Sequence, residues 1–279
     1  MKGRYALLVV LVAYGLVRAF WFLLENWGPL VDTMWAQAAL KTALWIPACV
    51  VVTMLAHGLS LRAALTELGF SDGPWRGIVF GLLATLPMAV AAQLGGLNPF
   101  HISVIAASAA IDPIAETILF TGFLSGQLFQ RARWPLPAAI AVSAFMFGLA
   151  HLQGFIVRLE TFLPALAAIA AGGALFTWVA HRWGNLWPAI ALHGAINLWW
   201  TLSGESSDTA RFFRLHVTPV AAGHAVSMAA AVALTLWWTR RPRLRWATIP
   251  PTAAAVTGRR SPDPSQTDKG RPGDRPAES

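Results

Sequence analysis

Charged side chains are scarce in this chain: Asp, Glu, Lys and Arg make up only 12% of its 279 residues. Soluble domains carry about 25% charged residues, and their surface helices show a regularly spaced polar face. Here 56% of the residues are hydrophobic, and apolar runs of about 20 residues recur along the chain. The shortage of charge therefore argues against a large soluble α-helical protein. It predicts an all-α membrane protein embedded in a lipid bilayer.

Cysteine is almost absent as well. The single cysteine, Cys49, has no partner for an internal disulfide, so it says nothing about the redox compartment. The formal net charge is +8, but the basic residues do not gather on one face of a soluble fold. We therefore expect no nucleic-acid partner. The HExxH pattern of many zinc peptidases is also missing.

Eight apolar segments are long enough to cross the bilayer, and we expect each to form a transmembrane helix. They are Tyr5–Leu24, Ala39–Leu59, Gly77–Leu94, Val104–Phe129, Leu136–Phe155, Phe162–His181, Leu186–Leu202 and Val217–Thr239. Stretches rich in Gly, Pro, Asn and Asp mark several of the connections between them. The sequence thus predicts a polytopic bundle of about eight spans.

Basic residues are distributed unevenly between the loops that these spans define. More of them fall on the side of the N-terminus, so the positive-inside rule predicts that both termini are cytoplasmic. Lys41 is one of the few basic residues assigned to the outer side. The same distribution indicates that the positive charge serves topology and contact with lipid headgroups.

Composition divides the chain into four segments. Residues 1–74 hold two spans and the stretch LSLRAALTELGFSDGPWRG, which predicts a short amphipathic helix at the cytoplasmic interface. Residues 75–202 form the core of the bundle, and residues 203–245 hold the last span with a basic end. Residues 246–279 have few apolar side chains, and we expect this cytoplasmic tail to be disordered.

Three of the predicted spans each carry two residues of interest one helical turn apart, hence on one face of the helix. The pairs are Asp112 and Glu116, Phe147 and His151, and His193 and Asn197. A charged residue at the bilayer centre costs about 2.5–3.5 kcal/mol on insertion scales. A buried network that only joins the helices is one interpretation. We favour a functional site, in which the histidines neutralise Glu116 because no Lys or Arg is closer in sequence than Arg131.

These segments resemble the three motifs of the CPBP family of intramembrane peptidases. The family comprises CaaX proteases and bacteriocin-processing enzymes, and is also called the Abi or type II CAAX endopeptidase family. The stretch IDPIAETILFTGFL resembles the first motif, FMFGLAHL the second and LWPAIALHGAINLWW the third. The resemblance covers roughly residues 75–202. It implies an endopeptidase that hydrolyses a peptide bond of a membrane-associated protein or peptide.

The resemblance also implies a role for each matching residue. Glu116 and His151 correspond to the pair that activates a water molecule in the family. His193 and Asn197 correspond to the pair that stabilises the oxyanion formed from the scissile carbonyl. This division agrees with elementary chemistry, since amide hydrolysis needs a base, a water and donors aimed at the developing negative charge.

Two residues depart from the first motif. Thr117 stands where the family has a second glutamate, and Thr121 stands where it has an arginine. These departures bear on efficiency or substrate choice more than on the chemistry. Of the remaining motif residues, Phe147 belongs to the second motif, and Asp112 either assists Glu116 or caps a helix broken at Pro113.

A zinc site is an alternative interpretation of the same side chains. Two histidines and one carboxylate are an accepted ligand set for catalytic zinc, which would make Glu116, His151 and His193 the ligands. We favour a metal-free, glutamate-dependent site, because three ligands on three separate helices do not follow from sequence spacing.

A catalytically degenerate scaffold of the bacteriocin-immunity type, or a small transporter, is the alternative from another class of protein. The ordered set of three motifs favours the peptidase, and the chain has no internal repeat of the kind found in transporters. Its composition, rich in Ala, Pro, Arg and Trp, favours a bacterial inner or plasma membrane, where prenylated CaaX proteins are not expected. The sequence leaves the substrate and the oligomeric state open.

Overall fold

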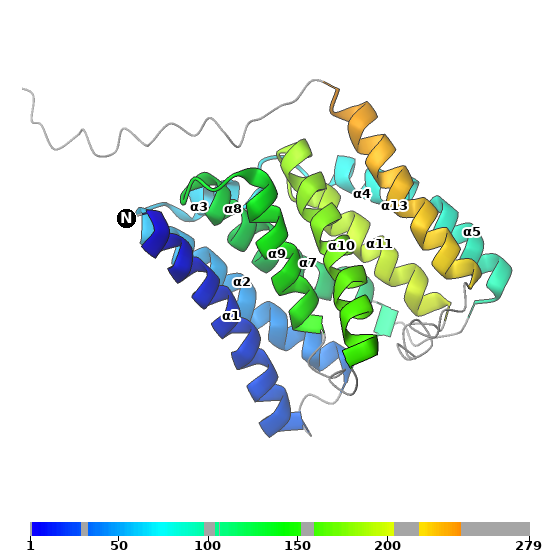
Figure 1. Ribbon diagram of the computed structural model, residues 1–279, viewed down its shortest axis with the longest axis horizontal. Coiled ribbons are helices and arrows are strands. Elements are labelled where there is room, and N and C mark those ends of the chain that lie inside the picture. The colour runs from blue at the N-terminus through cyan, green and yellow to red at the C-terminus, as the bar shows by residue number, and fades with distance from the viewer. Residues whose placement is uncertain are drawn as a thin grey trace, which may run out of the picture. The chain divides into compact units, whose positions relative to one another are not determined.

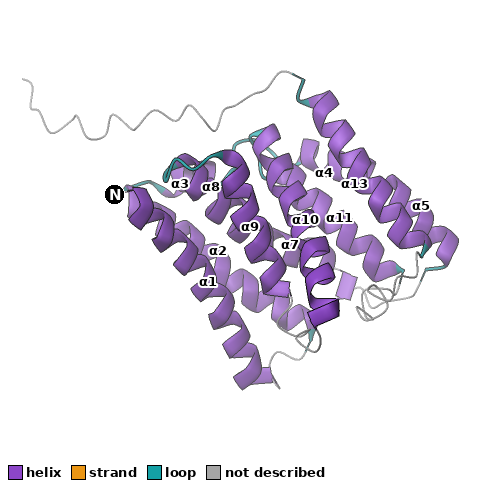
Figure 2. Cartoon of the chain, viewed as in Figure 1, coloured by secondary structure: helices purple, strands orange, loops and turns teal. Residues whose placement is uncertain are grey.

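The computed structural model describes residues 2–28, 33–97, 104–105, 107–151, 159–203 and 218–240. Every regular element in these ranges is a helix, which confirms the all-α prediction (Figure 2). The described helices belong to one compact unit that extends from Met1 to Ala247. The predicted disordered tail, residues 246–279, lies outside the described residues, as does the whole of the second unit, residues 248–279.

The longest apolar segments form helices that can cross a membrane. Among the described residues, four helices have the length and hydropathy for a span: α1 (Lys2–Trp27), α2 (Met34–His57), α10 (Leu159–Trp183) and α13 (Pro219–Trp238). One bent pair of helices can make a fifth span. The chain is therefore a multi-pass membrane protein, whereas the count of eight spans stays a prediction.

The end of α2 leads into the predicted interfacial helix. Gly58, with φ of 62°, ends α2 in the left-handed conformation that glycine adopts without strain. The Ser60 side chain then accepts a hydrogen bond from the backbone N–H of Ala63 and starts α3 (Leu61–Glu67). The short helix expected in this stretch is thus present.

The third predicted span, Gly77–Leu94, is not one straight helix. It consists of α4 (Trp75–Ala84) and α5 (Leu86–Gly95), which meet at an angle of 50° around Thr85. Pro87 explains the break, because proline lacks a backbone N–H and its ring clashes with the preceding turn. The Thr85 hydroxyl donates a hydrogen bond to the Gly81 carbonyl oxygen at 2.9 Å and so satisfies a group at the bend.

The fourth predicted span, Val104–Phe129, keeps a helical path but changes its winding. It passes from the π-helix η2 (Ala107–Ile111) through α7 (Asp112–Glu116) and the π-helix η3 (Thr117–Ser125) to α8 (Gly126–Gln130). Every residue of η3 is buried, so this segment forms the centre of the core. Wide π turns of this kind often occur at functional sites.

The remaining helices surround this central segment. Helices α9 (Leu136–His151) and α11 (Trp187–Leu202) flank α10, while α2 packs against α7 and α11 packs against η2 (Figure 1). The Gly194 Cα faces the backbone of η2 so closely that an added Cβ would lie 2.2 Å from the Ala109 carbonyl oxygen. Glycine at this position therefore allows α11 to approach the segment that carries Glu116.

The first turn of α1 and the last turn of α13 lie at the same end of the bundle. The Tyr5 hydroxyl lies 2.8 Å from Nε2 of His57 at the end of α2. At the same end of the bundle, the Leu186 N–H donates a hydrogen bond to the Gly69 carbonyl oxygen. Arg182, in the last turn of α10, donates one to the Thr239 carbonyl oxygen that follows α13. This arrangement is the one that termini on the same side of a membrane require. Which side is cytoplasmic stays a prediction.

Candidate active site

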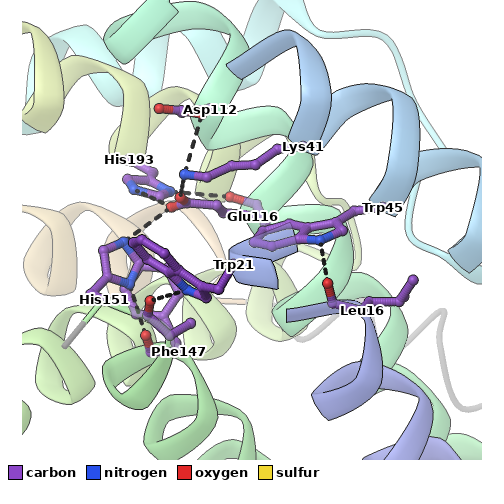
Figure 3. A network of polar contacts seen from close by, with 11 residues as sticks. Leu16, Trp21, Lys41, Trp45, Asp112, Glu116, Phe147, His151 and His193 are labelled. Atoms are coloured by element: carbon purple, nitrogen blue, oxygen red, sulfur yellow. Dashed lines mark hydrogen bonds and ion pairs between the residues drawn. The ribbon is translucent and has the colours of Figure 1, made fainter. Parts of the chain in front are cut away.

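Glu116 lies at the end of α7 with its side chain only 5% exposed, and a lysine neutralises it. The Lys41 ammonium nitrogen lies 2.6 Å from Oε1 of Glu116 and 3.3 Å from Oδ1 of Asp112 (Figure 3). Asp112 and Glu116 therefore share a helix face, as their spacing predicts. The expectation that histidines neutralise Glu116 missed Lys41 as its ion-pair partner, and the assignment of Lys41 to the outer side of the membrane stays a prediction. Lys41 and Glu116 are 75 residues apart in the sequence, so spacing along one helix could not indicate this ion pair.

Aromatic rings hold Lys41 in its apolar surroundings. Its ammonium lies 5.4 Å from the centre of the Phe20 ring on α1 and 5.8 Å from that of the Trp45 ring on α2. The Trp45 indole N–H donates a hydrogen bond to the Leu16 carbonyl oxygen at 3.1 Å, which fixes the ring (Figure 3). The negative face of an aromatic ring attracts a cation, so α1 and α2 together build a site for the lysine.

Both predicted catalytic histidines face the other oxygen of Glu116. Nε2 of His151 lies 3.3 Å from Oε2, and Nε2 of His193 lies 3.7 Å from the same atom. His193 is buried, whereas His151, the last residue of α9, is 33% exposed. The structure thus brings the two histidines and the glutamate together from three segments, and the carboxylate has one oxygen for the lysine and one for the histidines.

The hydrogen bonds of His151 define what its ring can do. Its Nδ1 lies 2.8 Å from the Phe147 carbonyl oxygen. A carbonyl only accepts, so Nδ1 must carry the hydrogen, and in a neutral ring Nε2 is then an acceptor. Two acceptors, Nε2 and the Glu116 oxygen, therefore face each other. Either the ring is charged or a water molecule donates to both.

His193 is held by two aromatic rings and a hydroxyl. Its ring stacks on Phe176 with centroids 4.6 Å apart, and Phe147 contacts it edge-on at 5.6 Å. Its Nδ1 lies 3.4 Å from the hydroxyl oxygen of Thr117. Phe147 in turn packs on Gly173, where an added Cβ would lie 2.9 Å from the ring. These contacts fix the imidazole plane beside Glu116.

The other predicted residues lie near this cluster but differ in their contacts. Asn197 follows His193 by one turn of α11 and is half-buried. Thr121 is buried, and its hydroxyl lies 3.1 Å from the hydroxyl of Thr177 on α10. The position of the family's arginine is thus occupied by a neutral pair of hydroxyls, which needs no charged partner.

The zinc alternative stays a hypothesis, and two observations bear on it. Within the described ranges, no group of three His, Cys, Asp or Glu side chains is arranged to hold a metal ion. Lys41 binds one oxygen of Glu116, and a cation at this distance competes with any metal for the carboxylate. We therefore derive no step that passes through a metal.

A second buried polar cluster lies at the other end of α2, and no spacing in the sequence indicated it. The Glu67 side chain of α3 is 1% exposed. It accepts two hydrogen bonds from Arg131, one from Nε at 2.9 Å and one from Nη2, and a third from the Gln127 amide at 2.9 Å. His57 and Tyr5 extend the network to Gln127. Burial raises the pKa of Glu67, but the bonds from Arg131 and Gln127 outweigh it and hold the pKa below its ordinary value.

One comparison with known proteins finds a family that matches the middle of the chain. Residues 98–199 match the family described as Rce1-like, type II CAAX prenyl endopeptidase Rce1-like. The matched range contains Glu116, His151, His193 and Asn197 but not Lys41. Neither the curated proteins nor the solved structures contain a match to the chain.

Proposed function

We propose that this chain hydrolyses a peptide bond of a membrane-associated protein or peptide, because its residues 98–199 match the type II CAAX prenyl endopeptidase family. One observation carries the proposal beyond the family: a single carboxylate oxygen of Glu116 faces Nε2 of His151 and Nε2 of His193. A buried base with two imidazoles around one free oxygen is suited to activating water.

The attacking water binds between Glu116 and His151 in this mechanism. Oε2 of Glu116 and Nε2 of a neutral His151 are both acceptors, so a water that donates to each satisfies both. The water oxygen bonds to the scissile carbonyl carbon, and its proton passes to Oε2. When the C–N bond breaks, Glu116 returns this proton to the leaving amine. The products are one carboxyl group and one amine.

His193 and Asn197 act on the carbonyl oxygen. If the Thr117 hydroxyl donates to Nδ1 of His193, then Nε2 carries the hydrogen and is a donor toward the site. The Asn197 amide, one turn further along α11, supplies a second N–H. Two donors placed before the reaction stabilise the oxyanion as it forms. In this assignment Thr117 orients His193, although it lacks the carboxylate of the family motif.

In this proposal the reaction uses no metal ion, and the protein lies in a membrane of defined type and orientation. The Lys41–Glu116 ion pair supports a carboxylate that works as a base and against one that works as a zinc ligand. The distribution of Lys and Arg supports cytoplasmic termini, and the composition, rich in Ala, Pro, Arg and Trp, supports a bacterial inner or plasma membrane. Reporter fusions after Arg240 and within residues 131–135 should then report the cytoplasm, and a periplasmic reading at both would reverse the topology.

The proposed activity is tested with purified, full-length protein in liposomes. The substrates are fluorogenic peptides anchored by a farnesyl group and the same peptides anchored by a palmitoyl group, so that the two arms separate a need for prenylation from a need for the bilayer. Wild type should cleave members of at least one arm, with or without 1,10-phenanthroline, and Glu116→Gln should cleave none. Glu25→Gln makes the same change on an exposed residue of α1 and should keep full activity.

Each other outcome has a defined meaning. Loss of activity with the chelator, restored by zinc, would overturn the metal-free mechanism. Cleavage by Glu116→Gln at the wild-type rate would overturn the assignment of the base. A wild-type protein that cleaves no peptide in either arm would favour the scaffold alternative.

A further inference from the structure

Lys41 lies outside the range that matches the family, yet it contacts the proposed base directly. It comes from α2, and the ring of Phe20 on α1 completes its surroundings. A charged side chain within a membrane helix is costly and in most cases functional. The first two helices of the chain, whose sequences resemble nothing specific, therefore contribute to the site.

The geometry gives Lys41 more than a role in joining helices. Its ammonium binds Oε1 of Glu116 at 2.6 Å, so the carboxylate cannot turn freely and Oε2 stays directed at His151 and His193. The nearby positive charge also favours the ionised form of the carboxylate, which is the form that accepts a proton. Lys41 thus determines both the orientation and the charge state of Glu116.

Asp112 completes this arrangement. When Glu116 takes the proton of the water, it becomes neutral and Lys41 loses its main counter-ion. A buried, unpaired ammonium is strongly unfavourable. Asp112, 3.3 Å from the same nitrogen, remains as a counter-ion through that step. The two carboxylates on one face of α7 therefore have separate tasks: one exchanges the proton and the other keeps the lysine paired.

We propose that Lys41 is a positioning residue that holds Glu116 ionised and directs its free oxygen toward the attacking water, with Asp112 as its permanent counter-ion. This inference rests on the proposed peptidase function. It adds a residue of α2 to a site that otherwise lies within residues 98–199.

The test compares kcat and KM on the best peptide of the liposome panel. Lys41→Gln should lower kcat by about 10²-fold and leave KM within about threefold, because misplacing a reacting group by 1 Å costs this much. Lys41→Arg keeps the charge and should retain kcat within about tenfold of wild type. Arg18→Gln removes an exposed basic residue of α1 and should change neither constant.

Lys41→Gln leaves two carboxylates side by side without a cation, which can prevent folding. Lys41→Gln with Asp112→Asn removes one charge of each sign and keeps the test valid, with the same loss in kcat expected. A wild-type kcat in Lys41→Gln, or in Lys41→Gln with Asp112→Asn, would overturn the role of Lys41 while leaving the peptidase function intact. A rise in KM alone would assign Lys41 to substrate binding and would also overturn it. If wild type itself is inert on every peptide, the proposed function fails first, and this inference fails with it.

Discussion

Two buried glutamates in this protein have basic partners, but they are bonded in different ways. Glu67 accepts hydrogen bonds on both oxygens, from Arg131 and from Gln127. Glu116 binds Lys41 through one oxygen, and its other oxygen lies 3.3 and 3.7 Å from the histidine nitrogens, with no donor assured. One carboxylate is saturated by the protein, and in the proposed mechanism the other keeps an oxygen for the attacking water.

The difference separates a structural glutamate from a reactive one. Fully satisfied polar networks make a buried region rigid, and partly satisfied ones are costly unless a ligand or water completes them. Glu67 joins α3 to the end of α8 through Gln127 and Arg131. Glu116 has an incomplete set of partners within the motif segment, where a water would complete it.

The largest expected effect comes from making the same substitution at both positions. Glu116→Gln should abolish peptide cleavage, since an amide does not accept the proton of water. Glu67→Gln should leave the rate per folded molecule near wild type but lower the free energy of unfolding by about 2–3 kcal/mol, because a charged hydrogen-bond partner is lost. Rates on the liposome panel and thermal unfolding in detergent measure the two effects. Equal effects of the two changes on the rate would remove the distinction.

A loss of the proposed oxyanion donor should have the next largest effect. Asn197→Ala should reduce kcat by about 10²–10³-fold, the usual cost of one such donor, and should leave residual cleavage. Single-turnover rates on an excess of protein measure it. A rate unchanged from wild type would show that the Asn197 amide does not face the substrate.

The hydroxyl that orients His193 should contribute less. Thr117→Val keeps the shape and removes one neutral hydrogen bond, so kcat should fall by about five- to tenfold. Thr121→Val makes the same change one turn further along η3, where the partner is Thr177, and serves as the control with an unchanged rate per folded molecule. A larger loss in the control than in Thr117→Val would contradict the assignment.

The smallest effect concerns acid stability. The pKa of Glu67 is lower in the folded protein than its ordinary value of about 4.3, so its stabilisation is complete above that value. It is lost as the pH falls below about 4.3 toward the folded pKa. Wild type should therefore lose more thermal stability than Glu67→Gln between pH 5 and pH 3. Parallel curves for the two proteins would contradict the ion pair.

The apolar pattern predicted the helices well but not their breaks. Hydropathy reports how apolar a stretch is, so α1, α2, α10 and α13 were found within a few residues of their ends. It does not report local backbone geometry. The bend at Thr85 follows from Pro87, and a mean over 20 residues conceals both this bend and the π turns of η2 and η3.

The three motifs named Glu116, His151 and His193, which the structure brings together, but they gave no sign of the lysine beside them. Spacing placed Asp112 and Glu116 on one face, and both contact Lys41. Lys41 was counted among the basic residues of the outer side of the membrane, and its position along the chain gave no sign of a contact with Glu116. The sequence likewise gave no sign that Glu67 is buried against Arg131. Both partnerships are tertiary contacts between distant segments.

The separation of Lys41 and Glu116 along the chain has a consequence for biosynthesis. Ribosomes make the chain from its N-terminus, so the lysine reaches the bilayer 75 residues before the glutamate that neutralises it. A long, flexible side chain near the end of a helix tolerates this delay because its ammonium can extend to the headgroups. The acidic residues of α7 then provide a partner inside the membrane, and α11 adds His193 later still. The ion pair is thus a product of late assembly, formed when separately inserted helices come together.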